Sequence, residues 1–236
     1  MQTKQKIYEV AKKLFIQEGY NNVTNKKIAE VSGENQGLIT YYFKNKSNIA
    51  NTILKENYQI ISSYLRNKVD VYEDPFLFNI TIDNLLTTLA EYANNYMRFV
   101  CEMIEHNVTI DSIYSGSQKN DIIVMIKKLV PESTQDINKY FRKFVTMTFP
   151  VGMQFQIEIN NGTDFSFDEY YETMVRLFVF ALNLKYDDET IKNYIEESTS
   201  IVEKIISDYP YLTNPEDYLI NKDIFKTSIV SELLDL

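Results

Sequence analysis

The residue types that most often carry catalysis are scarce in this chain of 236 residues. His106 is its one histidine and Cys101 its one cysteine, so a His/Cys metal cluster or a Cys–His dyad has too few members. Glu102 and Glu105 stand three residues apart, but no Glu-x-x-His pair occurs, which excludes a di-iron bundle of the usual kind. No glycine-rich phosphate-binding motif is present either. The sequence therefore predicts no catalytic residue, no metal site and no cofactor.

A different chemistry is indicated near the N-terminus by the segment NQGLITYYFKNK, residues 35–46. It combines a glycine, three aromatic side chains and two lysines. Residues 1–50 carry eight lysines against four glutamates, a net charge of +4, whereas the whole chain has a net charge of −9. This asymmetry indicates a small basic module joined to a larger acidic one. A basic module is compatible with nucleic acid if it also has the geometry that reads DNA.

Helices are expected throughout, because only six glycines and five prolines interrupt the chain and no long run alternates as a strand does. The sequence thus predicts an all-α protein. A first amphipathic helix is expected over residues 5–16, ending before Gly19. Later helices are expected over residues 75–107 with a break in the middle, 131–159 with a kink at Pro150, 167–184, 189–208 and 223–234.

Two short helices follow the first one, and each is opened by a capping residue. Thr24 is the expected N-cap of the second helix, which ends at Gly33. Asn35 is the expected N-cap of the third helix, residues 36–43, and Ser47 that of a long fourth helix. The inward-facing residues of the second helix are expected to be Ile28, Ala29 and Val31. Two short helices joined by a glycine-bearing turn predict a helix-turn-helix, whose second helix enters the major groove of DNA.

Residues 7–50 resemble the N-terminal domain of the tetracycline-repressor (TetR) family of bacterial transcriptional regulators. The matching positions are Ala11, Phe15, Gly19, Tyr20, Thr24, Ile28, Ala29, Gly33, Gly37, Tyr42, Phe43, Lys44, Lys46 and Ile49. The resemblance implies an all-α homodimer whose three N-terminal helices bind a palindromic operator, usually as a repressor that a small molecule releases. It also implies a helix-turn-helix DNA-binding domain, residues 1–46, followed by a helical ligand-binding and dimerisation domain, residues 47–236.

The residues expected to contact DNA lie in the second and third helices, at their caps and at the start of the fourth helix. They are Thr24, Lys26, Lys27, Asn35, Gln36, Gly37, Leu38, Thr40, Tyr41, Tyr42, Lys44 and Lys46. Gln36 can pair with adenine, and Gly37 permits a close approach of the backbone. Lys46 matches the family's lysine that reaches a phosphate, where it would release one counterion. Phe43 is expected to be core.

Two residues depart from the family's pattern. Glu34 stands in the turn, where the family usually has an apolar residue, and Thr40 stands where it often has a tyrosine that touches phosphate. Glu34 would place a negative charge near the DNA side. Together with the acidic total, it keeps open the alternative of an interaction protein that has this fold but has lost DNA binding. A helical enzyme is the other alternative.

Ligand-binding residues are expected among the aromatic, methionine and polar side chains of the larger domain. The candidates are Tyr92, Tyr96, Phe99, Glu102, Met103, His106 and Phe155. Glu102 and Glu105 lie near these aromatic residues in the sequence and favour a cationic effector, through carboxylate and cation–π contacts. The alternative is that an aromatic stripe at helical spacing is ordinary core, and that His106 is an ordinary surface or hydrogen-bonded histidine.

The dimer interface is expected on the helices around residues 135–159 and 167–184. One apolar stripe consists of Ile137, Phe141, Phe144, Thr148, Val151 and Phe155, and the other of Tyr170, Met174, Leu177, Phe178, Ala181 and Leu184. The pair would form a symmetric four-helix bundle with a second copy of the chain. The alternative is that both stripes pack inside one chain.

No membrane-spanning or secretory segment is expected. Lysines interrupt the N-terminal stretch, so it has the pattern of neither a signal peptide nor a membrane span. The single cysteine, Cys101, fits a reducing compartment. The expected location is the cytoplasm. The expected partners are double-stranded operator DNA, a second copy of the chain and an unidentified small-molecule effector, with no membrane.

Overall fold

The computed structural model describes residues 3–221. Within that range the chain forms eleven α-helices and three short helical turns, and no β-strand occurs there, which confirms the all-α prediction. None of the helices described there has the length and apolarity that crossing a bilayer requires. The described residues divide into two compact units: unit 1 comprises residues 3–60, 89–115 and 211–221, and unit 2 comprises residues 61–88 and 116–210. The helix expected over residues 223–234 lies outside the described residues.

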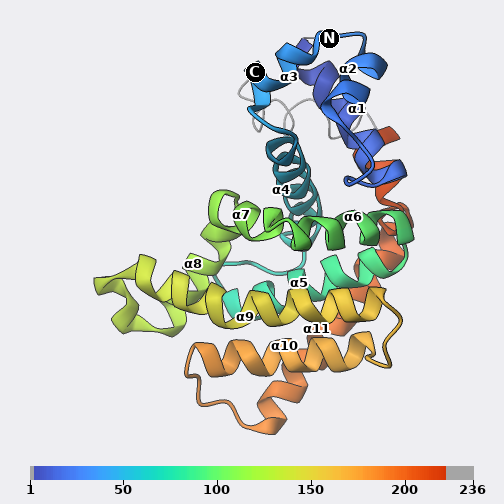
Figure 1. The fold of residues 1–236 in the computed structure, drawn as a ribbon. Helices are drawn as coiled ribbons and strands as arrows, with labels where there is room; N and C mark the ends of the chain where they lie inside the picture. The colour runs from blue at the N-terminus through green and yellow to red at the C-terminus, as the bar shows by residue number, and fades with distance from the viewer. Residues whose placement is uncertain (1–2, 222–236) are drawn as a thin grey trace. The chain divides into compact units, whose positions relative to one another are not determined.

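The first three helices of unit 1 form the predicted helix-turn-helix arrangement (Figure 1). They are α1, Thr3–Glu18, α2, Asn25–Ser32, and α3, Gln36–Phe43. The predicted N-caps of α2 and α3 are confirmed. The Thr24 hydroxyl accepts from the backbone N–H of Lys27 at 3.1 Å. Asn35 Oδ1 accepts from the N–H of Gly37 at 2.8 Å. Each cap satisfies an N–H that has no partner inside its helix.

The turn between α2 and α3 depends on Gly33, whose φ is 66°. Its N–H donates to the carbonyl of Glu30 at 3.3 Å, and the N–H of Glu34 donates to the carbonyl of Ala29 at 3.1 Å. This is the Schellman arrangement, in which a glycine takes the left-handed conformation without the penalty of a Cβ. Helix α2 therefore ends where the sequence predicted.

One prediction for α2 is wrong, because Val31 is 57% exposed rather than inward-facing. The buried residues of α2 are Ile28, Ala29 and Ser32. At about 100° per residue these three occupy one arc of the helix, and Val31 lies about 110° from the centre of that arc. Ser32 takes the inward position instead, and its hydroxyl donates to the carbonyl of Ala29 at 3.2 Å.

The core of unit 1 is built around α1. This helix contacts α2, α3, α6, Asn94–Glu105, and the single π-helical turn η3, Glu216–Asn221. Helix α7, Val108–Ser115, packs against α6. Fully buried residues of unit 1 include Ile7, Tyr8, Phe15, Ile28, Ile39, Ile49 and Phe99. The other elements of the unit are therefore assembled on α1.

Two helices belong to both units. The division falls inside α4, Lys46–Leu65, between its residues 60 and 61. It also falls inside α5, Pro75–Glu91, between residues 88 and 89. The break expected within residues 75–107 is confirmed by the gap between α5 and α6.

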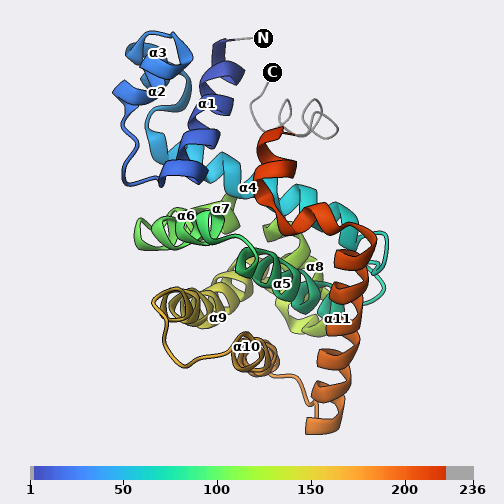
Figure 2. The same cartoon turned by 90° about the vertical axis from the view of Figure 1, so that its right-hand side faces the viewer.

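The remainder of unit 2 consists of four long helices and two short 3-10 turns. The helices are α8, Gln118–Leu129, α9, Ile137–Asn160, α10, Phe167–Ala181, and α11, Asp188–Asp208. The turn η1, Pro131–Gln135, precedes α9, and η2, Pro210–Thr213, begins at the end of the unit. Helices α9 and α10 lie side by side in both views (Figures 1 and 2). Phe144 of α9 meets Phe178 of α10 with ring centroids 4.8 Å apart.

Helix α9 starts later than expected. Pro131 opens the 3-10 turn η1 rather than the long helix. Asp136 then caps α9, since its carboxylate accepts from the N–H of Lys139 at 3.1 Å. The stretch contains two start signals, and the aspartate can satisfy a free helical N–H that proline cannot. Pro150 lies inside α9, as expected.

Most of the two apolar stripes expected at a dimer interface is buried inside the chain. The buried members are Phe141, Phe144, Thr148, Tyr170, Met174, Phe178 and Ala181. For these residues the alternative holds, because they already pack within unit 2. The large apolar side chains that α9 and α10 expose are Val151, a member of the expected stripe that is 39% exposed, and Phe180, which lies outside both stripes and is 70% exposed.

Candidate nucleic-acid interface

Helix α3 separates outward and inward residues as a reading helix requires. Its exposed residues are Gln36, Gly37, Thr40 and Tyr41, the last to 77%. Its half-buried residues are Leu38 and Tyr42. Ile39 and Phe43 are buried, which confirms the core position expected for Phe43. The exposed face carries hydrogen-bonding side chains, and the buried face anchors the helix on unit 1.

The structure shows a second reason for a glycine at position 37, which the sequence alone did not reveal. A Cβ at this position would lie 3.2 Å from Asn35 Oδ1, the atom that caps α3. Such a contact is tighter than ordinary van der Waals packing, so a side chain at position 37 would push on the cap. The glycine therefore protects the start of α3 as well as leaving its backbone open.

The two lysines of α2 differ in their freedom. Lys26 is exposed, and its ammonium lies 3.8 Å from Glu30, one turn along the same helix. Such a surface pair contributes little, so the ammonium can exchange Glu30 for a phosphate. Lys27 is half-exposed and its ammonium pairs with Glu18 at the end of α1. Lys27 therefore also ties the start of α2 to α1.

Glu34 does not present a free negative charge to DNA. Its Oε1 lies 3.3 Å from Lys6 Nζ of α1, and its side chain is half-buried. The ammonium offsets the carboxylate and holds the turn between α2 and α3 against α1. The pairing weakens the alternative in which this residue repels DNA.

Lys46, expected at a phosphate, is turned toward the loop between α1 and α2. Its ammonium donates to the backbone carbonyls of Tyr20 at 2.9 Å and Val23 at 3.0 Å, and it lies 3.9 Å from the centre of the Tyr20 ring. Burial lowers the pKa of Lys46, while the Glu102 carboxylate raises it. An ammonium has three N–H donors, so two are used here and one remains for a phosphate. Lys46 thus holds the loop that leads into α2.

The two residues between α3 and α4 form a tight, strained turn. Lys44 has φ 66° and ψ −51°, and the N–H of Asn45 donates to the carbonyl of Phe43 at 2.8 Å. These values describe the rare γ-turn with positive φ, which costs a residue with a Cβ on the order of 1–3 kcal/mol. Asn45 Oδ1 accepts from the N–H of Asn48 at 2.9 Å, so Asn45 rather than Ser47 caps α4. The reading helix is therefore joined directly to α4.

Helix α6 docks onto the end of α1 and onto the loop that follows it. Arg98 Nη2 donates to the carbonyls of Ile16 at 3.2 Å and Gln17 at 3.1 Å. These carbonyls belong to the last turn of α1, which lacks partners inside the helix and attracts cations. One turn later on α6, Glu102 Oε2 accepts from the N–H of Tyr20 at 2.6 Å. Side chains of α6 therefore hold the start of the α1–α2 loop.

Two more residues expected to bind ligand lie at the same junction. His106 Nε2 lies 2.7 Å from Asn21 Oδ1, and its ring centroid lies 5.3 Å from that of Tyr20. Phe99 stacks on Phe15 of α1 with ring centroids 6.4 Å apart. Glu102 and His106 thus contact the loop between α1 and α2, and Phe99 contacts α1, so the hydrogen bonds and packing that they make here are structural.

The other ligand candidates are dispersed. Met103 is fully buried in unit 1, and Tyr96 is buried there with a hydrogen bond to Asn57. Tyr92 is exposed at the end of α5. Phe155 belongs to unit 2, where its ring contacts other aromatic side chains. Of the seven candidates, Tyr92 and Tyr96 line one cavity of unit 1, and the other five do not line it.

An open cavity of about 590 Å³ lies in unit 1, lined by residues 92–96 and 213–216. Glu216 is its carboxylate, and this group already accepts from the side-chain amides of Gln17 at 3.2 Å and Asn95 at 3.3 Å. Most of the lining is polar, whereas pockets for small organic molecules are mostly apolar. The lining of this cavity is therefore more polar than that of a typical pocket for a small organic molecule.

The strongest polar contact between α1 and α4 was missed by the sequence analysis. Lys12 and Glu56 are 0% and 1% exposed, and Lys12 Nζ lies 3.0 and 2.9 Å from the two carboxylate oxygens of Glu56. Tyr8 OH donates to Glu56 at 2.6 Å, and Glu9 lies 3.1 Å from Lys12. Burial raises the pKa of Glu56, and Lys12 and Tyr8 oppose that rise. The available signal was that Lys12 stands four residues after Tyr8, on the apolar face of α1.

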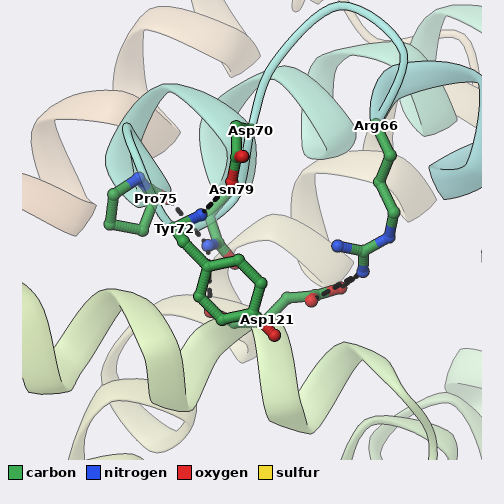
Figure 3. Close-up of polar contacts among 6 residues, drawn as sticks. All are labelled: Arg66, Asp70, Tyr72, Pro75, Asn79 and Asp121. Atoms are coloured by element: carbon green, nitrogen blue, oxygen red, sulfur yellow. Dashed lines mark hydrogen bonds and ion pairs between the residues drawn. The ribbon is translucent and has the colours of Figure 1, made fainter.

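In unit 2, the segment that follows α4 is anchored by a second ion pair (Figure 3). Arg66 Nη2 lies 2.7 Å from each carboxylate oxygen of Asp121 in α8, and the guanidinium lies 4.8 Å from the centre of the Phe78 ring. Asn79 of α5 donates to the carbonyls of Pro75 at 2.8 Å and Asp121 at 3.2 Å. Helix α4 is thus held by an ion pair within unit 1 and, just beyond its end, by another within unit 2.

Comparisons with known proteins agree with this geometry. Residues 7–53 match the family model described as "Bacterial regulatory proteins, tetR family". HTH-type transcriptional regulators of Staphylococcus aureus strains USA300 and N315 are each 29% identical to this chain over 108 residues, which is 42% of this chain and 58% of theirs. A regulator of the bovine strain RF122 is 29% identical over 109 residues, 42% of this chain and 59% of its own length. The chain thus spans less than two thirds of the length of these relatives.

The matched residues bear on the class of protein as well as on the fold. They contain α2 and α3 completely, with both caps and the glycine turn between them. The matching model and the similar proteins are described as transcriptional regulators, which favours a regulator over the helical enzyme kept as an alternative. Residues 7–53 of this chain thus form a helix-turn-helix domain like that of the tetR family of bacterial regulatory proteins.

Proposed function

We propose that this chain is a ligand-responsive transcriptional regulator that binds a palindromic operator as a homodimer, and that it is a repressor released by a small molecule. The observation that carries the DNA-binding part is the face of α3, on which Gln36, Thr40 and Tyr41 are exposed. Ile39 and Phe43 anchor that face from the buried side. Because a bacterial operator lies in the cytoplasm, the proposed location of the protein is the cytoplasm.

The proposed contacts divide into those that read bases and those that hold phosphates. Gln36, in the first turn of α3, is proposed to pair with adenine, and Leu38 and Thr40 to touch a thymine methyl group. Gly37 leaves room for the backbone to approach. The proposed phosphate contacts are Thr24, Lys26, Lys27, Asn35, Tyr41, Tyr42, Lys44 and Lys46. Of these, Lys26 is the exposed cation of α2, with only a weak surface partner.

The effector's signal is proposed to reach the reading helix through α6 and α4. Helix α6 grips the end of α1 through Arg98 and Glu102, and α4 follows α3 after the tight turn at Lys44. Movement of either helix is therefore passed on rather than absorbed by a linker. In a dimer the two reading helices must stand about 34 Å apart to enter successive major grooves, so a small change in that separation weakens operator binding.

The proposed dimer interface uses the outward faces of α9 and α10. Val151 and Phe180 are exposed apolar side chains there, and a symmetric partner would remove them from water. Phe180→Glu should convert the dimer to a monomer in size-exclusion chromatography with light scattering. Tyr72→Glu changes an aromatic side chain of unit 2 that is similarly exposed, and it should leave the dimer intact. A monomeric wild-type protein would overturn this part of the proposal.

Mobility shifts on DNA from upstream of the protein's own gene, over a series of salt concentrations, test operator binding. The wild type should bind selectively and lose affinity as salt rises. Lys26→Ala should reduce the salt slope by about one on every sequence, whereas Gln36→Ala should weaken one base preference by about 1–3 kcal/mol. Lys204→Ala removes the same charge from the surface of α11 and should leave the slope unchanged. Absence of any selective complex at low salt would favour the interaction protein.

A further inference from the structure

Asp83, on α5, is a carboxyl group whose hydrogen-bond partner is a tyrosine. The hydrogen-bond donor that reaches it is Tyr170 OH of α10, 3.3 and 3.1 Å from its two oxygens. Within residues 3–221, no lysine, arginine or histidine pairs with it. One phenolic proton shared by two oxygens leaves most of the acceptor capacity of the carboxylate unused.

Asp83 is largely removed from water, yet part of its side chain is still accessible from the surface. The surrounding protein withdraws water from it and raises its pKa to about 7, and the hydrogen bond from Tyr170 only partly opposes that rise. Its side chain is half-buried, so part of its surface remains accessible. A carboxylate in such a place attracts a cation more strongly than a surface carboxylate does, because less water screens the interaction. Poorly paired acids of this kind cluster at functional sites.

The side chains beside Tyr170 form an aromatic group. The ring of Phe155 lies 6.1 Å from that of Tyr170, and the ring of Phe165 lies 5.0 Å from that of Phe155. Gly152 faces the same hydroxyl, because a Cβ there would lie 3.5 Å from Tyr170 OH and 3.0 Å from the methyl carbon of Met174. Aromatic rings therefore continue from Tyr170, whose hydroxyl reaches Asp83, to Phe155 and on to Phe165, which is 47% exposed. A carboxylate and aromatic rings are the two kinds of group that hold an organic ammonium.

We propose that Asp83 binds the cationic head of the effector, an organic amine or quaternary ammonium compound, next to the hydroxyl of Tyr170. This proposal rests on the ligand-responsive function proposed above and names the class of its ligand. Two carboxylates of unit 1 are less suited to that role. Glu102 already accepts from the N–H of Tyr20, and Glu216 accepts from two side-chain amides.

Cation binding at Asp83 should be coupled to release of a proton below pH 7. Tyr170 and Tyr171 are the titratable residues that face Asp83, and burial raises the pKa of both, so they stay neutral in this range. A bound cation favours the charged carboxylate and must displace the proton that the free carboxyl holds, given its pKa of about 7. Affinity for a permanent cation should therefore fall by up to about tenfold for each pH unit below about 7, and be constant above it.

Isothermal titration calorimetry with benzyltrimethylammonium and its uncharged carbon isostere, neopentylbenzene, tests the role of charge. The wild type should bind the cation at least about tenfold more tightly than the isostere. Asp83→Asn should remove that preference and leave the affinity for the isostere unchanged. Asp111→Asn, which removes one charge from the exposed surface of α7, should change neither affinity.

Three results would overturn the proposal: equal affinity of the wild type for both compounds, no binding of the cation at millimolar concentration, or an unchanged cation affinity in Asp83→Asn. If circular dichroism shows that Asp83→Asn does not fold, the affinities of the wild type for the cation and for the isostere decide the test. Titrations at pH 6 in two buffers of different ionisation enthalpy measure the protons released, and zero release contradicts the proposal. Calorimetry contains no DNA and the mobility shift contains no cation, so failure here is distinguishable from failure of operator binding.

Discussion

Two carboxyl groups, Glu56 in unit 1 and Asp83 in unit 2, are both largely removed from water but differ in their partners. Glu56 accepts from Tyr8 and from the ammonium of Lys12, so its charge is paired and α1 is joined to α4. Among the residues that the structure describes, Asp83 accepts from Tyr170 and has no cation beside it. A paired acid fixes two helices against each other, whereas an unpaired one destabilises the fold and leaves an acceptor for a ligand.

The same contrast extends to the polar residues around the reading helix. Glu34 is paired with Lys6, Glu18 with Lys27, and the ammonium of Lys46 with two carbonyls. Each contact joins α1, or the loop after it, to the elements that follow in the sequence. These pairs therefore hold α2 and α3 in a fixed position on α1. A DNA-binding surface needs such rigid support, because its side chains must match the positions of the bases and phosphates.

Breaking the paired acid should have the largest effect. Lys12→Met leaves Glu56 buried without its cation, and removing one partner of a buried pair costs about 3–5 kcal/mol of the free energy of unfolding. Urea unfolding followed by circular dichroism measures the loss. Lys13→Met changes the exposed neighbouring position and should alter the free energy of unfolding by less than about 0.5 kcal/mol. Equal losses in the two variants would show that Glu56 does not depend on Lys12.

The unpaired acid should be visible in the pH dependence of stability. The pKa of Asp83 is about 7 in the folded protein against an ordinary 3.8, so the folded state keeps a proton that the unfolded chain has released. Its contribution to stability is therefore present at low pH and is lost as pH rises toward 7. Relative to the wild type, Asp83→Asn should gain about 2 kcal/mol in the free energy of unfolding between pH 5 and pH 8.

Urea unfolding of the wild type and Asp83→Asn across that range supplies the measurement. Asp111→Asn is the control for loss of one negative charge and should follow the wild-type profile. Parallel profiles for the wild type and Asp83→Asn would show that Asp83 is hydrated like an ordinary surface carboxylate, and the contrast with Glu56 would then disappear.

The smallest effect is expected at the turn that joins the reading helix to α4. Lys44→Gly and Lys44→Ala remove the same charge, but only glycine accepts a φ of 66° without strain. The glycine variant should therefore be about 1 kcal/mol more stable than the alanine variant in urea unfolding. Identical stabilities would mean that the turn carries no strain. The close coupling of α3 to α4 would then come from the shortness of the two-residue connection and not from backbone strain.

Local features of the fold were predictable where the interacting residues are close in the sequence. The Thr24 and Asn35 caps and the end of α2 at Gly33 each involve residues at most five positions apart. Burial was less predictable, as Val31 shows, because the buried arc of a short helix depends on which helices pack against it. The stripe residues of α9 and α10 show the same limit, since an apolar stripe does not say whether its partner is the same chain or another.

By itself, the sequence determined the helical class, the capped helix-turn-helix and the resemblance of its N-terminal residues to the tetR family, because these depend on spacing within a few turns of chain. Only the tertiary structure decided what the polar residues do. Lys46 meets a carbonyl 26 residues away, Glu102 an N–H 82 residues away and Asp83 a tyrosine 87 residues away. The spacing of residues in the sequence does not predict these contacts. They depend on how the packed helices bring polar atoms from distant parts of the chain within about 3 Å of each other.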